Sequence, residues 1–215
     1  MLAAYTFNTE YRPNPQGNMP QLRLLEGGKF MSGDYAPILL QEEGKIRLKY
    51  FQWGLITDLL QVRPDREARL YLTAEQSLRR PPYLSLLRRQ RCLIPTDGFY
   101  VNGKQGQAGS TLKVAKASGD TFCLAGVYDI HQQEDGQLLH SFAVLTVNSP
   151  MRLSLAGRRM PLILPSNVEA TWLNPYTDLN KIQKMLQLPL GAGLSVHHVQ
   201  ELRLPAATQF DPLAA

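Results

Sequence analysis

Two cysteines and a pair of adjacent histidines are the residues that first suggest a metal or nucleophilic site in this chain. Cys92 and Cys123 stand in apolar surroundings and form no Cys-x-x-Cys pair, which predicts inert, buried thiols rather than a zinc site. His197 and His198 are predicted on a strand, where neighbouring side chains point to opposite faces, and no third ligand lies near them in the sequence. The sequence therefore predicts no metal and no cofactor.

The most informative stretch runs from Arg91 to Tyr100 and reads Arg-Cys-Leu-Ile-Pro-Thr-Asp-Gly-Phe-Tyr. It predicts a buried strand, a Pro-Thr-Asp-Gly turn and an aromatic return strand. Asp97 is predicted to hydrogen-bond its own backbone within that turn. A run this long and this ordered in residue type is not an accident of composition.

The elements around this stretch are mostly strands, with helices grouped rather than alternating with them. A Ser-x-x-Glu pattern at Ser166 predicts a capping box, and Arg88, Arg89 and Arg91 are predicted to form a solvated helix edge. This arrangement indicates an α+β fold, with one domain over residues 1–205 and a C-terminal tail over 206–215. Strands are predicted over 1–8, 45–56, 91–94, 111–116, 121–128, 138–147 and 194–199, and helices over 74–80, 83–90, 166–172 and 177–186.

The overall composition is that of a folded globular protein. The chain has 215 residues, 44% of them hydrophobic and 19% charged, and a formal net charge of +5. That charge favours phosphate contacts but is shared by many proteins with no nucleic-acid role. No apolar run of membrane-spanning length and no secretory signal is found, which predicts a cytoplasmic protein without a membrane partner.

Several motifs, in order along nearly the whole chain, resemble the SOS response-associated peptidase (SRAP) family, whose members capture abasic sites in single-stranded DNA. The resemblance implies a single domain with a mostly antiparallel, bifurcated or barrel-like β-sheet and flanking helices. The motifs are Tyr5-Thr6, Ala36-Pro37 (as a short proline turn), Trp53-Gly54-Leu55-Ile56, Ala74-Glu75, Arg91 to Tyr100, Thr146, Arg159-Met160-Pro161 and Trp172-Leu173-Asn174-Pro175.

The family chemistry needs residues that this chain lacks. Family members use an N-terminal cysteine whose amine and thiol close a thiazolidine ring on the abasic aldehyde, assisted by an Asn, a Glu and a His. General acid–base groups typically contribute about 10²–10⁴-fold in rate, and aliphatic side chains supply none. The corresponding positions hold Leu2, Tyr71, Val101 and Gly157, and a phosphate-contacting Arg of the family is replaced by Thr73.

Other matched positions imply contacts with nucleic acid. In the family the tryptophan lies beside the DNA channel, so Trp53 is either a core aromatic or a platform for a base. Arg159 is aligned with a phosphate contact, and Arg158 adds charge beside it, although adjacent arginines often form only a solvated turn. Thr146 and Pro37 complete the predicted nucleic-acid-binding set.

Three functions are compatible with this pattern. The first is a pseudoenzyme of the DNA damage response that binds single-stranded DNA without crosslinking it. The second is residual imine or lyase activity on abasic sites through the α-amino group of Met1, part of which is unprotonated at neutral pH. The third is a protein- or ligand-binding scaffold that has no role on DNA.

Overall fold

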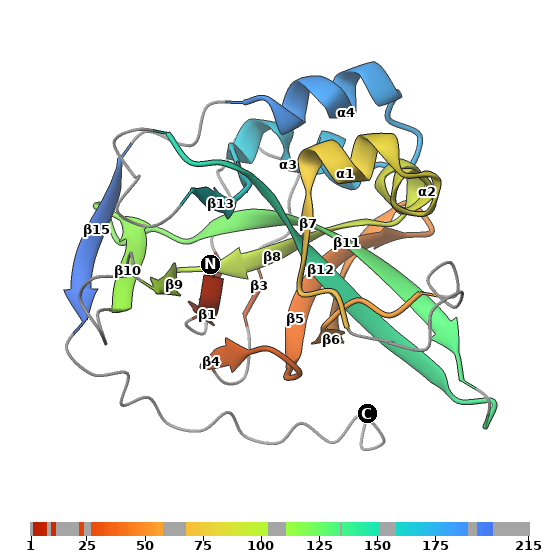
Figure 1. Ribbon diagram of the computed structural model, residues 1–215, viewed down its shortest axis with the longest axis horizontal. Helices are drawn as coiled ribbons and strands as arrows, with labels where there is room; N and C mark the ends of the chain where they lie inside the picture. Colours follow the sequence, from red (N-terminus) through yellow and green to blue (C-terminus); the bar gives the residue numbers. More distant parts are fainter. Residues whose placement is uncertain are drawn as a thin grey trace.

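A computed structural model of the chain describes residues 2–7, 10–11, 22–23, 27–57, 68–102, 111–133, 135–150, 158–188 and 193–199. Its described strands form a five-stranded sheet, an eight-stranded sheet and a two-stranded pair. Four helices lie together on one side of these strands (Figure 1). The α+β fold that was predicted is confirmed. The predicted tail, residues 206–215, lies outside the described residues.

The five-stranded sheet is antiparallel and carries the N-terminal strand near its middle. Its order is β15-β10-β9-β1-β4, and every pairing in it is antiparallel. Residue 2 therefore lies within a sheet, where its pairing with β9 fixes its position. The strands are β1 (Leu2–Phe7), β4 (Gly28–Met31), β9 (Gly98–Asn102), β10 (Thr111–Lys116) and β15 (Leu194–Val199).

The eight-stranded sheet closes on itself and gives the barrel-like form. Its order is β13-β12-β6-β5-β8-β11-β14, β7 also pairs with β12, and an additional pairing of β12 with β11 completes a ring. The pairings of β12 with β6 and β7 are parallel. The strands are β5 (Tyr35–Glu42), β6 (Lys45–Trp53), β7 (Tyr71–Thr73), β8 (Arg91–Thr96), β11 (Phe122–Gln132), β12 (Leu138–Asn148), β13 (Arg159–Pro161) and β14 (Ile163–Leu164). The two-stranded pair is β2 (Glu10–Tyr11) with β3 (Leu22–Arg23).

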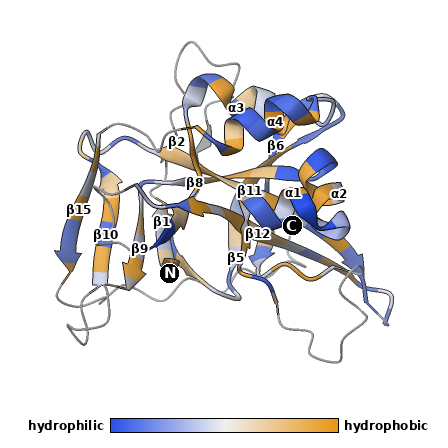
Figure 2. Ribbon diagram, turned by 45° about the horizontal axis from the view of Figure 1, so that its top comes forward, coloured by the Kyte–Doolittle hydropathy of each residue, from blue (hydrophilic) through white to orange (hydrophobic). Residues whose placement is uncertain are grey.

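Strand β8 lies at the centre of the core, with all six of its residues buried. It pairs with β11, where Gly126 lies opposite Cys92. A Cβ atom at Gly126 would lie 2.9 Å from Cys92 Sγ and 2.6 Å from Ile94 Cδ1, so only glycine fits this contact between strands. The strand predicted from Arg91 is present, but it continues through Pro95 and Thr96, which were predicted to lie in the turn. The aromatic strand β9 does not return along β8, because it pairs with β1 and β10 in the five-stranded sheet. Hydrophobic residues line the strands around them (Figure 2).

The helices follow signals in the sequence at most of their ends. Helix α1 (Ala74–Arg79) has a capping box formed by Thr73 and Gln76, and α2 (Pro81–Arg89) has prolines in its first turn. Helix α4 (Leu179–Leu186) is capped by the carboxylate of Asp178. Helix α3 (Ser166–Leu173) has its N-cap one residue earlier than predicted, at Pro165, so the capping box predicted at Ser166 is wrong. None of these described helices has the length and apolar character that a membrane span requires.

Arg91 is buried at 2% exposure, so its predicted place on a solvated helix edge is wrong. Its guanidinium donates to the carbonyls of Leu87 and Arg88 at the end of α2, and to those of Trp172 and Asn174 at the end of α3. Helix C-termini carry partial negative charge, which explains how this cation is held by carbonyl oxygens. Burial lowers the pKa of Arg91 to about 10, so the side chain stays charged at neutral pH.

Pro37 lies within strand β5 rather than in the short turn that was predicted. It is opposite Tyr50 on β6, whereas the described bridge of β5 to β8 is at Leu39 and Leu93. A proline has no backbone N–H to donate to a neighbouring strand. Pro37 is not part of the described bridge between β5 and β8. The residue is buried.

Candidate functional site

Three of the substituted positions come together in space, although they lie far apart in the sequence. Leu2 on β1 is paired in register with Val101 on β9. The Tyr71 hydroxyl, at the start of β7, donates a hydrogen bond to the Leu2 carbonyl oxygen. The resemblance thus identified one structural cluster, which we call the residue-2 cluster: Leu2, Tyr71 and Val101. Gly157 lies outside the described residues.

The two aliphatic members of the residue-2 cluster are closed to solvent, whereas Tyr71 is half-buried. Leu2 is 5% exposed and Val101 is fully buried. Burial raises the pKa of Tyr71 to about 12, so its phenol is protonated at neutral pH and acts here as a hydrogen-bond donor. These three side chains provide no nucleophile and no group that titrates near neutrality.

Arg159 lies at the start of β13 and is held by several neighbours. Its Nε donates to Thr146 Oγ1 at 3.3 Å, and its Nη2 donates to the Thr146 carbonyl at 2.8 Å. Nη1 donates to Asn148 Oδ1 at 3.2 Å, and Nη2 forms an ion pair of 2.7 Å with Glu75 on α1. The guanidinium is thus oriented, but one of its anion-binding edges is already occupied by a carboxylate.

The carboxylate of Glu75 is ionised in this pair. Burial acts to raise the pKa of Glu75, but hydrogen bonds from its own backbone and from Arg159 outweigh that effect and hold the pKa below its ordinary value. Sequence reasoning recognised Glu75 only as part of a motif and missed its pairing with Arg159. No local signal reveals a contact between residues 84 positions apart.

Arg158 and Thr146 differ in how they are presented. Arg158 is exposed, and its carbonyl accepts a hydrogen bond from the Ser149 amide. Thr146 is buried beside Thr73 on β7, its partner in the parallel pairing, and acts as an acceptor for Arg159. Of the predicted nucleic-acid-binding residues, Arg158 has the most accessible charge.

Trp53 is a core residue with 0% exposure. Its indole N–H donates to the Leu70 carbonyl at 3.1 Å. Its ring packs against Tyr5, Tyr71 and Phe142 at centroid distances of 5.5, 6.0 and 6.5 Å. The ring therefore supports Tyr71 from behind and has no exposed face in this conformation, and its contact with a base stays a prediction.

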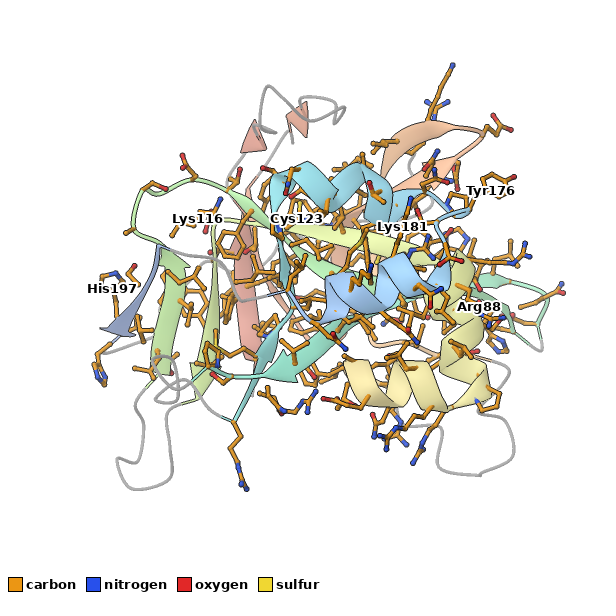
Figure 3. All side chains as sticks on the ribbon, turned by 90° about the horizontal axis from the view of Figure 1, so that it is seen from above. Arg88, Lys116, Cys123, Tyr176, Lys181 and His197 are labelled. Carbon is orange, nitrogen blue, oxygen red and sulfur yellow. The ribbon has the colours of Figure 1, made fainter. Side chains whose placement is uncertain are left out.

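The cysteines and histidines that first suggested a metal or nucleophilic site do not meet. Cys92 and Cys123 are both buried, and burial raises the pKa of the Cys92 thiol well above its ordinary value. His197 lies on the outer strand β15 and contacts Ser195, far from Cys123 in the interior (Figure 3). Over the described ranges, no group of three or more metal-ligating side chains is found.

The closed ring of strands, the second sheet and the grouped helices define a known class of α+β fold. A structure from Bacteroides thetaiotaomicron matches with a TM-score of 0.71 and 21% identity, over 80% of this chain and 77% of the other. A structure from Bordetella bronchiseptica matches with a TM-score of 0.70 and 18% identity, over 92% and 99%.

The chain belongs to the SOS response associated peptidase (SRAP) family, whose model matches residues 5–202. It is 28% identical over 184 residues to the abasic site processing protein YobE of Bacillus subtilis, covering 82% of this chain and 83% of that protein. It is 24% identical over 140 residues to the abasic site processing protein YMR114C of Saccharomyces cerevisiae, covering 62% and 36%.

Proposed function

We propose that this chain is a cytoplasmic SRAP-family pseudoenzyme, which binds single-stranded DNA without forming a covalent bond to it. The observation that carries the proposal is the residue-2 cluster. Leu2 is buried against Val101 and its carbonyl is bonded to Tyr71, in the place where the family chemistry requires a thiol and titratable side chains.

The chemistry of capture explains why this cluster argues against a crosslink. A thiazolidine needs both an amine and a thiol to add to the same aldehyde carbon. An amine alone gives an imine, which water hydrolyses. The Leu2 side chain has no lone pair to donate, and a Tyr71 phenol with a pKa of about 12 is a poor base at neutral pH.

Binding to DNA is supported by the positive net charge of the chain and by its similarity to named relatives. The net charge is +5, Arg158 is exposed, and relatives are named abasic site processing proteins. Because Arg159 is paired with Glu75, few phosphate contacts remain at this position. Binding is therefore expected to be weak, with a shallow dependence of log affinity on log salt concentration.

The test combines abasic and intact single-stranded oligonucleotides of the same length. Native gels and fluorescence anisotropy should show binding of both, weakening as salt is raised, whereas denaturing gels should show no adduct. A denaturant-resistant adduct with the abasic strand would overturn the pseudoenzyme assignment. An adduct seen only after borohydride treatment would instead reveal imine chemistry at the Met1 amine. Absence of salt-sensitive binding would favour a scaffold without a DNA role.

A matched pair of variants locates the bound strand. Arg158→Gln should weaken binding to the intact oligonucleotide about threefold at low salt, because the variant cannot pair its exposed side chain with a phosphate. Lys181→Gln, on the exposed surface of α4 (Figure 3), removes the same charge at another place and should leave the affinity unchanged. Equal weakening in both variants would mean that DNA is held by diffuse charge rather than at Arg158.

A further inference from the structure

A small basic pocket adjoins the residue-2 cluster. It has a volume of about 270 Å³ and lies between β7 and the junction of α1 with α2. Tyr71 belongs to both the pocket and the cluster. None of the family motifs identified in the sequence includes its two arginines. The lining residues are Arg69, Tyr71, Leu72, Gln76, Arg80 and Tyr83.

Among the described residues, no acidic side chain compensates the charges of this pocket. Arg69 and Arg80 are both exposed, and neither guanidinium forms an ion pair with another described residue. Within the described part of the chain, no acidic side chain lines the pocket. Two cations that share a pocket repel each other, so an anion bound between them would be favoured by both.

Gln76 supplies a neutral donor to the same pocket. Its side-chain oxygen accepts from the Thr73 amide in the capping box of α1. That contact fixes the side chain and leaves its Nε2 hydrogens as donors. A guanidinium can donate two parallel hydrogen bonds to two oxygens of one phosphate. The side-chain amide of Gln76 can donate a further hydrogen bond to a phosphate oxygen from another side of the pocket.

We propose that the pocket of Arg69 and Arg80 is a phosphate-binding subsite for the backbone of single-stranded nucleic acid. This inference rests on the proposed function, because the pocket extends the surface that begins at the residue-2 cluster. The Arg that the family places on β7 is Thr73 here, and Thr73 is used to cap α1. Arg69 and Arg80 place positive charge on either side of Thr73 in the sequence. A volume of about 270 Å³ accommodates a phosphodiester with part of its sugar.

The experiment compares Arg69→Gln/Arg80→Gln with Arg88→Gln/Arg89→Gln in the full chain. Both pairs remove two exposed positive charges. Arg80 is the N-cap of α2 and Arg88 lies near its other end, about 12 Å further along the helix axis at a rise of about 1.5 Å per residue. The probe is an intact single-stranded oligonucleotide, followed by anisotropy over a salt series. The pocket pair should bind about tenfold more weakly at low salt, and its log–log salt slope should become shallower by about 0.7 for each phosphate that is no longer neutralised. The control pair should keep both values.

The outcomes separate this inference from the proposed function. If the unmodified protein binds no single-stranded DNA, the proposed function fails and the subsite fails with it. If the unmodified protein binds but the two pairs are weakened equally, or the pocket pair is not weakened at all, only the subsite is overturned. Polyglutamate is the second probe: a pocket that binds it as tightly as the oligonucleotide, with the same weakening in Arg69→Gln/Arg80→Gln, would be a site for acidic polypeptides instead.

Discussion

At the scale of single residues, Val101 shows how closely the interior around Leu2 is packed with aliphatic side chains. It is fully buried, and its neighbours in register are Leu2 on β1 and Leu112 on β10. A carboxylate at this position would be surrounded by aliphatic carbon, with the Tyr71 hydroxyl already directed to a backbone carbonyl. Reintroducing the single family residue would therefore place an unpaired charge in the core.

We predict that Val101→Glu lowers the free energy of unfolding by about 3 kcal/mol at pH 7. Burial raises the pKa of the new carboxyl above its unfolded value of about 4.3, so the folded state binds more protons than the unfolded state. The loss of stability should therefore grow as the pH rises from about 4 to 7. Urea unfolding at several pH values measures this, with each variant compared with the unmodified protein.

Val101→Gln is the matched control for this prediction. It adds a polar side chain of the same size but cannot ionise, so its cost should be independent of pH over the same range. A cost for Val101→Glu that is equally flat would show that the position is open to water or has a hidden partner, and that the buried, apolar description of the residue-2 cluster is wrong.

At the scale of elements, most boundaries followed from local signals. Signals that act through near neighbours include the buried run that opens at Arg91, the prolines at the start of α2 and the Asp178 cap of α4. The wrong placement of Arg91 has its cause in distant parts of the chain. Arg91 looked like a surface arginine because its acceptors on α3 lie more than 80 positions away.

Helix α1 begins next to Thr73, where the family resemblance implies a phosphate-contacting Arg and where this chain has a helix cap. Thr73 Oγ1 accepts from the Gln76 amide at 3.1 Å, and the Gln76 side chain accepts in return from the Thr73 amide. The same turn presents Glu75 to Arg159 and Gln76 to the basic pocket. The cap therefore helps to position one side chain of the Glu75–Arg159 ion pair and one of the basic pocket.

Thr73→Ala should lower the free energy of unfolding by about 1 kcal/mol, because an N-cap acceptor is removed. Thr73→Ser keeps a hydroxyl at the same place and should stay within about 0.5 kcal/mol of the unmodified protein, as serine caps at least as well. Urea denaturation followed by circular dichroism measures both. Equal stability of the alanine and serine variants would mean that the capping box adds nothing to α1.

At the scale of the whole molecule, the residue-2 cluster joins the two large sheets, because Leu2 and Val101 lie in the five-stranded sheet and Tyr71 lies in the eight-stranded sheet. The closed ring of strands was the part of the fold least accessible from sequence. Its closure depends on the parallel pairing of β12 with β6 and on the pairing of β12 with β11, whereas β7 pairs with β12 outside the ring. The β12–β6 and β12–β7 pairings join segments that are distant in the sequence. No periodicity within a strand specifies such partners. Only the family resemblance pointed to a barrel-like sheet.

Net charge is also a property of the whole molecule, but its effect on binding depends on where each charge lies. Glu75→Gln and Glu43→Gln each remove one negative charge, which takes the net charge from +5 to +6. Glu75 neutralises Arg159 at 2.7 Å, whereas Glu43 lies exposed in the turn between β5 and β6. The two variants therefore separate total charge from local charge.

We predict that Glu75→Gln binds intact single-stranded DNA about threefold more tightly at low salt, with a log–log salt slope steeper by about 0.7, because Arg159 becomes available to one phosphate. Glu43→Gln should bind as the unmodified protein does. Anisotropy over a salt series provides both quantities. An equal gain in the two variants would mean that total charge governs binding, and no gain in either would mean that the strand does not approach Arg159 and follows another path across the molecule.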